Sequence, residues 1–472
     1  MNIVLVIFDS LRKDCIGAYG RPFWGKVHTP HFDSFASQSI IFNSAFPESL
    51  PTLPARRAIY TGKRVYPFFN GDFRLKGDFV GAAGWGPIPE DQPTLSEILR
   101  ESGYRTALIS DVYHMFKPSK NFWRGFDQWT FLRGQETDPA RSGPKLTKNQ
   151  IDYWLAEKMQ NENNIRFIQQ CIMNMHDRWQ EEEFFAPKVL REASKWLTQN
   201  QDAEKFFLVV ESFDPHEPWI VPPYYRKMYL KEDGPEQIKS GYSQQQLDSY
   251  LLRRTQANYS GEVTMCDRWF GYFMETMRVM GLLENTLIIF TADHGHSIGD
   301  RSYIGKRGYP SMPEVFEVPL MIRMPQAKYS GKTSDIFVQH HDIAAEIIEM
   351  AGVKVRPSVD GKPFLENALK GKSIRDHVTV GWGANPTVIT EDWWLNFKMD
   401  MTGILLYRRK GKDAFRVNYA LKYPQIVKKL MKIAIDDAGG TFPEWLVELA
   451  RKQQDAPGCS DLAARGKIPF LK

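Results

Sequence analysis

Short apolar runs recur along the chain, and each ends at a polar or glycine-rich turn. They read NIVLVIF, RTALIS, KFFLVVESF, NTLIIFTAD and PLMIRMP. Between them lie segments with helical periodicity, such as TLSEILRESG, which closes at Gly103, and DRWFGYFMETMRVMG, which closes at Gly281. Continuous apolar strands that alternate with helices are typical of a mostly parallel sheet covered on both faces. The pattern therefore predicts an α/β/α sandwich with a mostly parallel central sheet.

A change of pattern near Ser373 predicts a second, smaller region. The stretches HVTVGWG, TVITEDWWLNFKM and GILLYRRK have the composition and spacing of short strands, and the segments YPQIVKKLMKIAIDDA and PEWLVELARKQQ after them are helical in pattern. We therefore expect a catalytic domain over residues 1–372 and a small α+β subdomain over residues 373–472. The polar, helix-prone segment 134–203 is expected to form a helical insertion or a cover over the sheet.

Composition narrows the class of protein. Lys plus Arg number 61 and Asp plus Glu number 56, so the charge balance indicates neither a nucleic acid nor an anionic membrane as a partner. The N-terminal apolar run meets Asp9 too soon for a secretory signal, and no later run reaches the roughly 20 residues that cross a bilayer. Four scattered cysteines without a CxxC spacing argue against a disulfide framework and a cysteine-bound zinc site. We expect a cytoplasmic protein, and the sequence leaves its oligomeric state open, a homo-oligomer included.

Polar residues that directly follow the apolar runs are the first candidates for chemistry, because ligands of an open α/β sheet bind beyond the carboxyl ends of its strands. NIVLVIF is followed by Asp9, and NTLIIFTA by Asp293 and His294. Carboxylates suit Mg²⁺, Mn²⁺ or Ca²⁺, and the imidazole also allows Zn²⁺. Asp9 alone could equally be a helix N-cap, but the three residues together favour a site for one divalent cation.

The stretch SLPTLPARRAIYTGKR places the hydroxyl of Thr52 among several bases. Arg56 follows four residues later, one helical turn away, and can present its guanidinium to an anion beside Thr52. Pro54 suits the first turn of a helix, whose free N–H groups would point to the same place. Taken alone, these residues could also be an N-cap and a surface base.

The same stretch resembles the sulfatase signature, in which a cysteine or serine precedes x-Pro-Ser-Arg and a Thr-Gly-Arg follows. Further segments match that family in order over most of residues 1–370: IVLVIFDSLRKDCIGAYG, HTPHFDSFASQSIIFNSAF, DPHEPW, TADHGHSIGDRSYIGKRG with PEVFEVPLMIRMP, and VQHHDIAAEIIEMAG. The resemblance implies membership of the alkaline phosphatase superfamily, whose proteins are α/β sandwiches that hydrolyse sulfate, phosphate or phosphonate esters at a metal. The substrate it implies is a small anionic ester.

The resemblance also implies roles for nine side chains. The metal ligands that it implies are Asp9, Asp293, His294 and the oxygen of Thr52. Four further residues would surround the anion, namely Arg56, Lys63, His216 and Lys306, with His216 or Lys306 near the leaving group. His114 falls close to the Lys-x-His pair of many members, but Val112 stands at the lysine position, so His114 is a candidate substrate contact and equally a structural histidine.

Two departures from the family shape the functional hypothesis. Ser10 stands where sulfatases often have a second carboxylate, which disfavours a site built for Ca²⁺ alone. Thr52 stands where sulfatases carry the cysteine or serine that is oxidised to formylglycine, and threonine offers neither that precursor nor its release by elimination. Relatives in the superfamily that cleave phosphodiesters do use threonine beside one metal. The identity of the metal, Zn²⁺, Mn²⁺, Mg²⁺ or Ca²⁺, stays open.

The sequence therefore predicts a metal-dependent hydrolase that cleaves phosphate diesters or phosphonate monoesters with Thr52 as the nucleophile. An arylsulfatase-like sulfuric ester hydrolase is the first alternative, because the family resemblance alone would name it. A phospho-group transferase and an inactive homologue are weaker alternatives. Transferase relatives usually carry membrane segments, and an inactive homologue would be expected to lose some of the bases Arg56, Lys63 and Lys306.

Overall fold

The structure, a computed structural model, describes residues 1–69, 82–118, 120–176, 178–238, 249–354 and 358–454. The chain forms two compact units, each assembled from separated segments. The first unit comprises Met1–Asn43, Ser96–Lys306 and Val318–Thr333, and the second comprises Ser44–Leu95, Arg307–Glu317 and Ser334–Lys472. The domain division expected at residue 372 stays a prediction, and residues 455–472 of the expected subdomain lie outside the described part.

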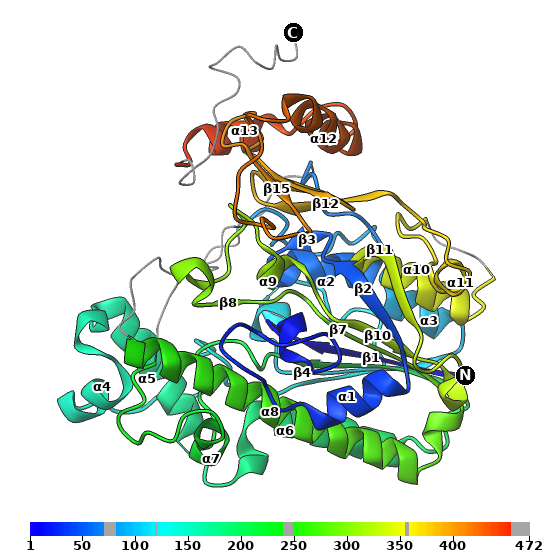
Figure 1. The fold of residues 1–472 in the computed structure, drawn as a ribbon. Helices are drawn as coiled ribbons and strands as arrows, with labels where there is room; N and C mark the ends of the chain where they lie inside the picture. The colour runs from blue at the N-terminus through cyan, green and yellow to red at the C-terminus, as the bar shows by residue number, and fades with distance from the viewer. Residues whose placement is uncertain (70–81, 119, 177, 239–248, 355–357, 455–472) are drawn as a thin grey trace. The chain divides into compact units, whose positions relative to one another are not determined.

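A large mixed sheet confirms the predicted α/β architecture (Figure 1). Its strand order is β11-β2-β10-β7-β1-β6-β4-β5. In chain order the strands are β1 (Asn2–Phe8), β2 (Ile40–Phe46), β4 (Arg105–Ser110), β5 (Gln128–Phe131), β6 (Phe206–Ser212), β7 (Thr286–Ala292), β10 (Leu320–Arg323) and β11 (Thr333–Gln339). The five apolar runs are thus β1, β4, β6, β7 and β10. The central strands β1, β6 and β7 are buried along their whole length, which is why they read as continuous apolar runs.

Pairing within the sheet brings the ends of its central strands together. Strand β1 runs parallel to β6 and β7, and β4 runs parallel to β5 and β6, whereas β10 is antiparallel to β7 and β2. Phe8, the last residue of β1, pairs with Ser212 of β6 and Ala292 of β7. The residues that follow these three strands therefore emerge side by side at one edge of the sheet.

Helices α1, α6 and α8 lie along one face of this sheet (Figure 1). The helices of the first unit are α1 (Pro30–Ser37), α3 (Leu95–Glu101), α4 (Lys148–Trp154), α5 (Glu162–Met175), α6 (Phe185–Gln199), α7 (Pro223–Lys227) and α8 (Ser249–Val279). Its 3₁₀ turns are η1 (Lys13–Cys15), η2 (Tyr113–Phe116), η3 (Glu157–Met159), η4 (Glu181–Glu183), η5 (Leu282–Glu284), η6 (Asp300–Ser302) and η7 (Pro325–Ala327). A short hairpin joins β8 (Ser297–Ile298) to β9 (Ile304–Gly305). Helices α4, α5 and α6 fall within the segment 134–203, and α6 packs on β6 and α8.

Aromatic packing anchors helices α1 and α8 beneath the ends of the central strands. Phe8 and Phe290 come from β1 and β7, and Phe32 and Phe270 come from α1 and α8. The ring centroids of these four residues lie 5.0 to 6.5 Å apart. Each such pair contributes about 0.5–1.5 kcal/mol beyond the area it buries. Asp9 directly follows Phe8, so this packing fixes the position from which its side chain leaves the sheet.

The second unit contains the small antiparallel sheet expected near the C-terminus. Its strand order is β15-β14-β13-β12-β3. The strands are β3 (Ser49–Leu50), β12 (His377–Trp382), β13 (Asn385–Thr390), β14 (Trp393–Asn396) and β15 (Leu405–Arg408). The helices are α2 (Thr52–Thr61), α9 (Pro313–Phe316), α10 (His340–Met350), α11 (Leu365–Leu369), α12 (Pro424–Asp437) and α13 (Glu444–Arg451). Strand β3 lies just before Thr52 in the sequence and pairs in parallel with β12.

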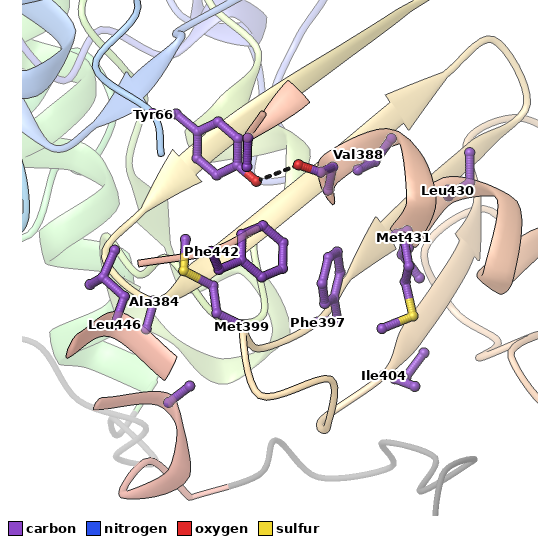
Figure 2. Packing of buried hydrophobic residues seen from close by; sticks show 14 of the residues in the cluster. Tyr66, Ala384, Val388, Phe397, Met399, Ile404, Leu430, Met431, Phe442 and Leu446 are labelled. Carbon is purple, nitrogen blue, oxygen red and sulfur yellow. Dashed lines mark hydrogen bonds between the residues drawn. The ribbon is translucent and has the colours of Figure 1, made fainter. Parts of the chain in front are cut away.

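Amphipathic helices α12 and α13 cover this small sheet. Figure 2 shows Leu430 and Met431 of α12 and Leu446 of α13 in one cluster with Phe397 and Phe442. Burying side chains of this kind stabilises a fold by about 1.5–3 kcal/mol each. The hydroxyl of Tyr66 donates a hydrogen bond of 3.0 Å to the carbonyl of Ala434 (Figure 2), which ties the segment after α2 to helix α12.

Candidate active site

Asp9, Asp293 and His294 meet at the carboxyl ends of β1 and β7 in the first unit. One ligand atom from each residue lies within 4.8 Å of the others, and all three side chains are fully buried. The parallel register of the two strands explains this proximity, because Phe8 and Ala292 are paired and the next residue of each chain segment leaves the sheet at the same edge. The three residues that the sequence placed at strand ends therefore form one group, called here the strand-end group.

Ser10 orients both carboxylates of the strand-end group. Its backbone N–H donates to Asp293 Oδ1 at 3.0 Å, and its hydroxyl donates to Asp9 Oδ1 at 2.8 Å. The backbone N–H of His294 donates to the same Asp293 oxygen at 2.7 Å. The serine that replaces a family carboxylate thus has a positioning role that the sequence did not reveal.

His294 is held as a neutral imidazole. Its Nδ1 lies 2.9 Å from the carbonyl of Gly295, a contact in which Nδ1–H donates, so the lone pair resides on Nε2. Nε2 lies 3.4 Å from Asp293 Oδ2 and 3.4 Å from Lys306 Nζ. Burial, reinforced by the charge of Lys306, holds the pKa of His294 well below its ordinary value. A neutral imidazole with an oriented lone pair is the form that ligates metals.

The strand-end group has the donors that a divalent cation requires. Two carboxylates and one imidazole suit Mn²⁺ or Zn²⁺, and the carboxylates also suit Mg²⁺ or Ca²⁺. Two negative charges about 4–5 Å apart repel each other by ~4 kcal/mol at an effective dielectric constant of about 20, and full burial removes the water that would stabilise them. A bound cation relieves both costs. The residues present therefore fit a metal.

Lys306 and His216 lie beside the strand-end group in the same unit. Lys306 Nζ is 2.8 Å from His216 Nε2 as well as 3.4 Å from His294 Nε2. The ring of His216 stacks on Phe213 with centroids 4.1 Å apart, and its Nδ1 lies 2.9 Å from the carbonyl of Glu217. These contacts present Nε2 of His216 toward the ammonium group, so two basic side chains converge where an anionic ester could bind.

Two carboxylates beside His216 were missed by the sequence analysis: Glu217, which is buried, and Glu136, whose side chain is 12% exposed. Glu136 Oε1 lies 3.7 Å and Glu217 Oε2 lies 3.3 Å from His216 Nδ1. His114, the candidate substrate contact, lies here too, with its Nε2 3.2 Å from Glu136 Oε2, and burial lowers its pKa. For Glu217, the sequence offered one signal, its position next to His216 in DPHEPW. For Glu136 it offered none, since the segment 134–203 matched no motif.

Thr52, Arg56 and Lys63 lie in the second unit on or just after α2. Pro51 occupies the N-cap position and Thr52 is the first helical residue, so the helix begins one residue earlier than it would with Thr52 as its N-cap. Arg56 is fully buried one turn later, and its Nη1 donates to the Thr52 carbonyl at 3.2 Å. Gly62, with φ of 65°, ends the helix, and Lys63 Nζ then contacts Asp360 Oδ1 at 3.3 Å.

Comparison with known proteins identifies the family. The Sulfatase family model matches residues 1–353. The chain belongs to the sulfatase family. Members of this family are ester hydrolases that bind a divalent metal and act on small anionic esters, so the protein is a sulfatase-family hydrolase.

Its relatives span different named activities. The arylsulfatase of Clostridium perfringens is 25% identical over 424 residues, which cover 83% of this chain and 84% of that protein. The multifunctional alkaline phosphatase superfamily protein PehA of Trinickia caryophylli is 24% identical over 421 residues, which cover 79% of this chain and 77% of that protein. The crystal structure of the phosphonate monoester hydrolase of Agrobacterium radiobacter shares the fold of this sulfatase-family chain, with a TM-score of 0.69, 20% identity, and coverage of 92% of this chain and 96% of that chain.

Within the described residues of this sulfatase-family chain, no helix is both long and apolar enough to cross a bilayer.

Proposed function

We propose that the protein hydrolyses phosphate diesters or phosphonate monoesters and that Thr52 is its nucleophile. The observation that carries this proposal is the threonine itself, at the position where the sulfatase signature has cysteine or serine. A sulfatase releases sulfate by elimination from the hydrate of formylglycine, and a threonine ester has no such exit. Water must instead attack the covalent ester, a step that positive charges around a phosphoryl group promote.

The proposed division of labour follows the chemistry of the side chains. Asp9, Asp293 and His294 would hold the divalent cation, with the Thr52 oxygen as the further ligand that the resemblance implies. That cation lowers the pKa of the hydroxyl and offsets charge on the anion. Basic side chains stabilise the anion and assist the leaving group.

The basic side chains stabilise the anion and the leaving group. Arg56, which is buried and follows Thr52 by one turn, orients the nucleophile segment and neutralises the anion. Lys63 and Lys306 add positive charge. His216 assists departure of the leaving group, and His114 contacts the substrate.

Two named relatives support a phosphoryl or phosphonyl substrate. PehA is a multifunctional member of the alkaline phosphatase superfamily, and the Agrobacterium radiobacter protein with the same fold is a phosphonate monoester hydrolase. The arylsulfatase relative favours the second candidate function, hydrolysis of sulfuric esters. The two functions differ in the atom attacked and in how the covalent ester is released.

A matched panel of p-nitrophenyl esters tests the proposal. The metal-loaded protein is assayed on the sulfate, the phosphate monoester, a phosphate diester and a phenylphosphonate. We expect the diester or the phosphonate to have the highest kcat/KM. Fastest turnover of the sulfate would instead establish the arylsulfatase alternative and remove the role given to Thr52.

Two substitutions isolate the hydroxyl of Thr52. Thr52→Val keeps the branched shape of this buried side chain, and we expect kcat/KM to fall by on the order of 10³-fold or more. Thr52→Ser, the matched control, keeps a hydroxyl and should retain measurable turnover of the same substrate. Undiminished activity in a folded Thr52→Val protein would disprove the nucleophile.

A further inference from the structure

The ring of His216 is held by Phe213, a residue of the same loop after β6. The two rings stack with centroids 4.1 Å apart, and the backbone N–H of His216 donates to the Phe213 carbonyl at 2.9 Å. Both side chains are buried. The position of Phe213 therefore decides where Nε2 of His216 lies relative to Lys306 Nζ, which is 2.8 Å away.

Asp111 fixes the backbone of Phe213. Its Oδ1 accepts the Phe213 N–H at 2.7 Å, and its side chain is fully buried. Asp111 directly follows β4, which runs parallel to β6 and pairs Ser110 with Glu211. This register brings the carboxylate of Asp111 to the start of the loop that carries His216.

Gln135 joins Asp111 to Asp214, the residue after Phe213. The side-chain nitrogen of Gln135 carries two hydrogens and donates to Asp111 Oδ2 and to Asp214 Oδ1, each at 2.8 Å. The second oxygen of Asp214 accepts the backbone N–H of Ala186 at 3.0 Å, in the first turn of α6. The backbone is thus fixed at Phe213 and again at the next residue. We call Asp111, Gln135 and Asp214 the Gln135 bridge.

Neighbouring groups balance the two carboxylates of the Gln135 bridge. Burial, reinforced by the charge of Asp214, raises the pKa of Asp111 well above its ordinary value. Burial also raises the pKa of Asp214, whereas the hydrogen bond from Gln135 and the positive charge of Arg178 lower it. Burial raises the pKa of nearby Glu262 well above its ordinary value, so Glu262 holds its proton. Because each of the four carboxylate oxygens of the bridge accepts a hydrogen bond, the network keeps its members in one arrangement.

We propose that the Gln135 bridge positions His216 for catalysis through Phe213. The bridge fixes Phe213, the Phe213 ring fixes the imidazole, and the imidazole assists departure of the leaving group. A catalytic group must be held within about 0.5 Å of its productive position, so the loss of one link reduces the assistance that His216 gives. The proposal rests on the role of His216 in the proposed function, but not on whether the ester is phosphoryl or sulfuryl.

The dependence of turnover on the leaving group tests this positioning. Aryl esters of the class that turns over fastest are prepared with phenols of increasing basicity, from p-nitrophenol to phenol, and kcat/KM is measured for each. A more basic departing oxygen depends more on a group that offsets its charge. We expect the loss of kcat/KM in Gln135→Met to be at least about tenfold larger for the phenyl ester than for the p-nitrophenyl ester. An equal loss for all esters would overturn the proposal, because it indicates a general loss of structure.

Thr286→Val is the matched control. Thr286 is fully buried, and its hydroxyl donates to the Leu282 carbonyl at 2.5 Å, so this variant also removes a buried donor. Thr286 begins β7, at the opposite end of that strand from Asp293. Any loss of kcat/KM in Thr286→Val should be the same for every ester. A loss that grows with the basicity of the phenol as steeply as in Gln135→Met would contradict the positioning role.

His216→Gln separates this proposal from the proposed function. Its loss of kcat/KM should grow with the basicity of the phenol at least as steeply as in Gln135→Met. Adding Gln135→Met to His216→Gln should not steepen the dependence further, because both changes act through one side chain. A uniform loss in His216→Gln would remove the role of His216 and this proposal with it. A growing loss in His216→Gln and a uniform loss in Gln135→Met would overturn the positioning alone.

A spectroscopic measurement needs no substrate. The ring nitrogens of His216 are observed by nuclear magnetic resonance in protein with isotope-labelled histidine, and their signals are assigned by their absence from His216→Gln. Gln135→Met should shift these signals, and Thr286→Val should not. If Gln135→Met fails to fold, Phe213→Leu, which removes the stacked ring, is measured in the same two ways. Unshifted His216 signals in the folded variant would overturn the proposal.

Discussion

The strand-end group and a neighbouring group formed by Glu136, His216 and Glu217, called here the loop group, contain similar side chains, but they are held in different ways. Backbone N–H groups of Ser10 and His294 fix Asp293 of the strand-end group at the edge of the sheet. In the loop group, Glu136 contacts the side chain of His114, and Glu217 contacts the side chain of His216. Backbone donors follow from the sheet, whereas side-chain donors depend on how loops pack. The comparison teaches that local sequence can locate the first kind of site and not the second.

The largest expected difference concerns activity. Asp293→Asn should lower kcat/KM by on the order of 10³-fold, because it removes a charged ligand next to the reacting atoms. Glu136→Gln should cost about 10–100-fold, because its carboxylate acts through His216. Both values are measured on the fastest p-nitrophenyl ester with metal in excess. Equal losses of kcat/KM in the two variants would show that the strand-end group and the loop group do not differ in their importance for activity.

A smaller effect is expected from Ser10→Ala. The variant keeps the backbone N–H that binds Asp293 and loses only the hydroxyl that donates to Asp9 at 2.8 Å. We expect the metal concentration that gives half-maximal activity to rise by about 10–100-fold. Ser194→Ala is the control, since its buried hydroxyl donates to Leu190 within helix α6. An unchanged metal dependence for Ser10→Ala would refute the positioning role of the hydroxyl.

The smallest effect concerns stability near the loop group. Gln135 precedes Glu136, and its buried Nε2 donates to both Asp111 Oδ2 and Asp214 Oδ1 at 2.8 Å. Gln135→Met leaves these two buried carboxyl groups without that donor, and we expect the free energy of unfolding in urea to fall by about 1–3 kcal/mol.

Gln201→Met is the control for that measurement. Gln201 is exposed and donates only to the Thr198 carbonyl among the bonds of its side chain in the described structure, so little change is expected. An equal loss of stability in both variants would show that the Gln135 bridge has no special role in holding the Glu136 loop.

The pattern of the sequence predicted much of the fold and part of the candidate site. Each apolar run became a strand, Gly103 and Gly281 follow the ends of helices α3 and α8 with positive φ, and the C-terminal strands form an antiparallel sheet. Periodicity determines these features locally, through the burial of alternate or successive side chains. It could not show the part that Ser10 plays, because a serine after an aspartate has no pattern of its own.

By itself, the sequence determined five strands of the large sheet, the position of Asp9, Asp293 and His294 at strand ends, and the family. Tertiary structure alone decided that Glu136 meets His216, which lies 80 residues further along the chain. Secondary-structure preferences of the sequence act over a few residues. The contact between Glu136 and His216 instead depends on how the loop after β5 packs against the loop after β6, and these strands are separated in the sheet only by β4. The sheet brings the loops together, and only their packing brings the carboxylates to one imidazole.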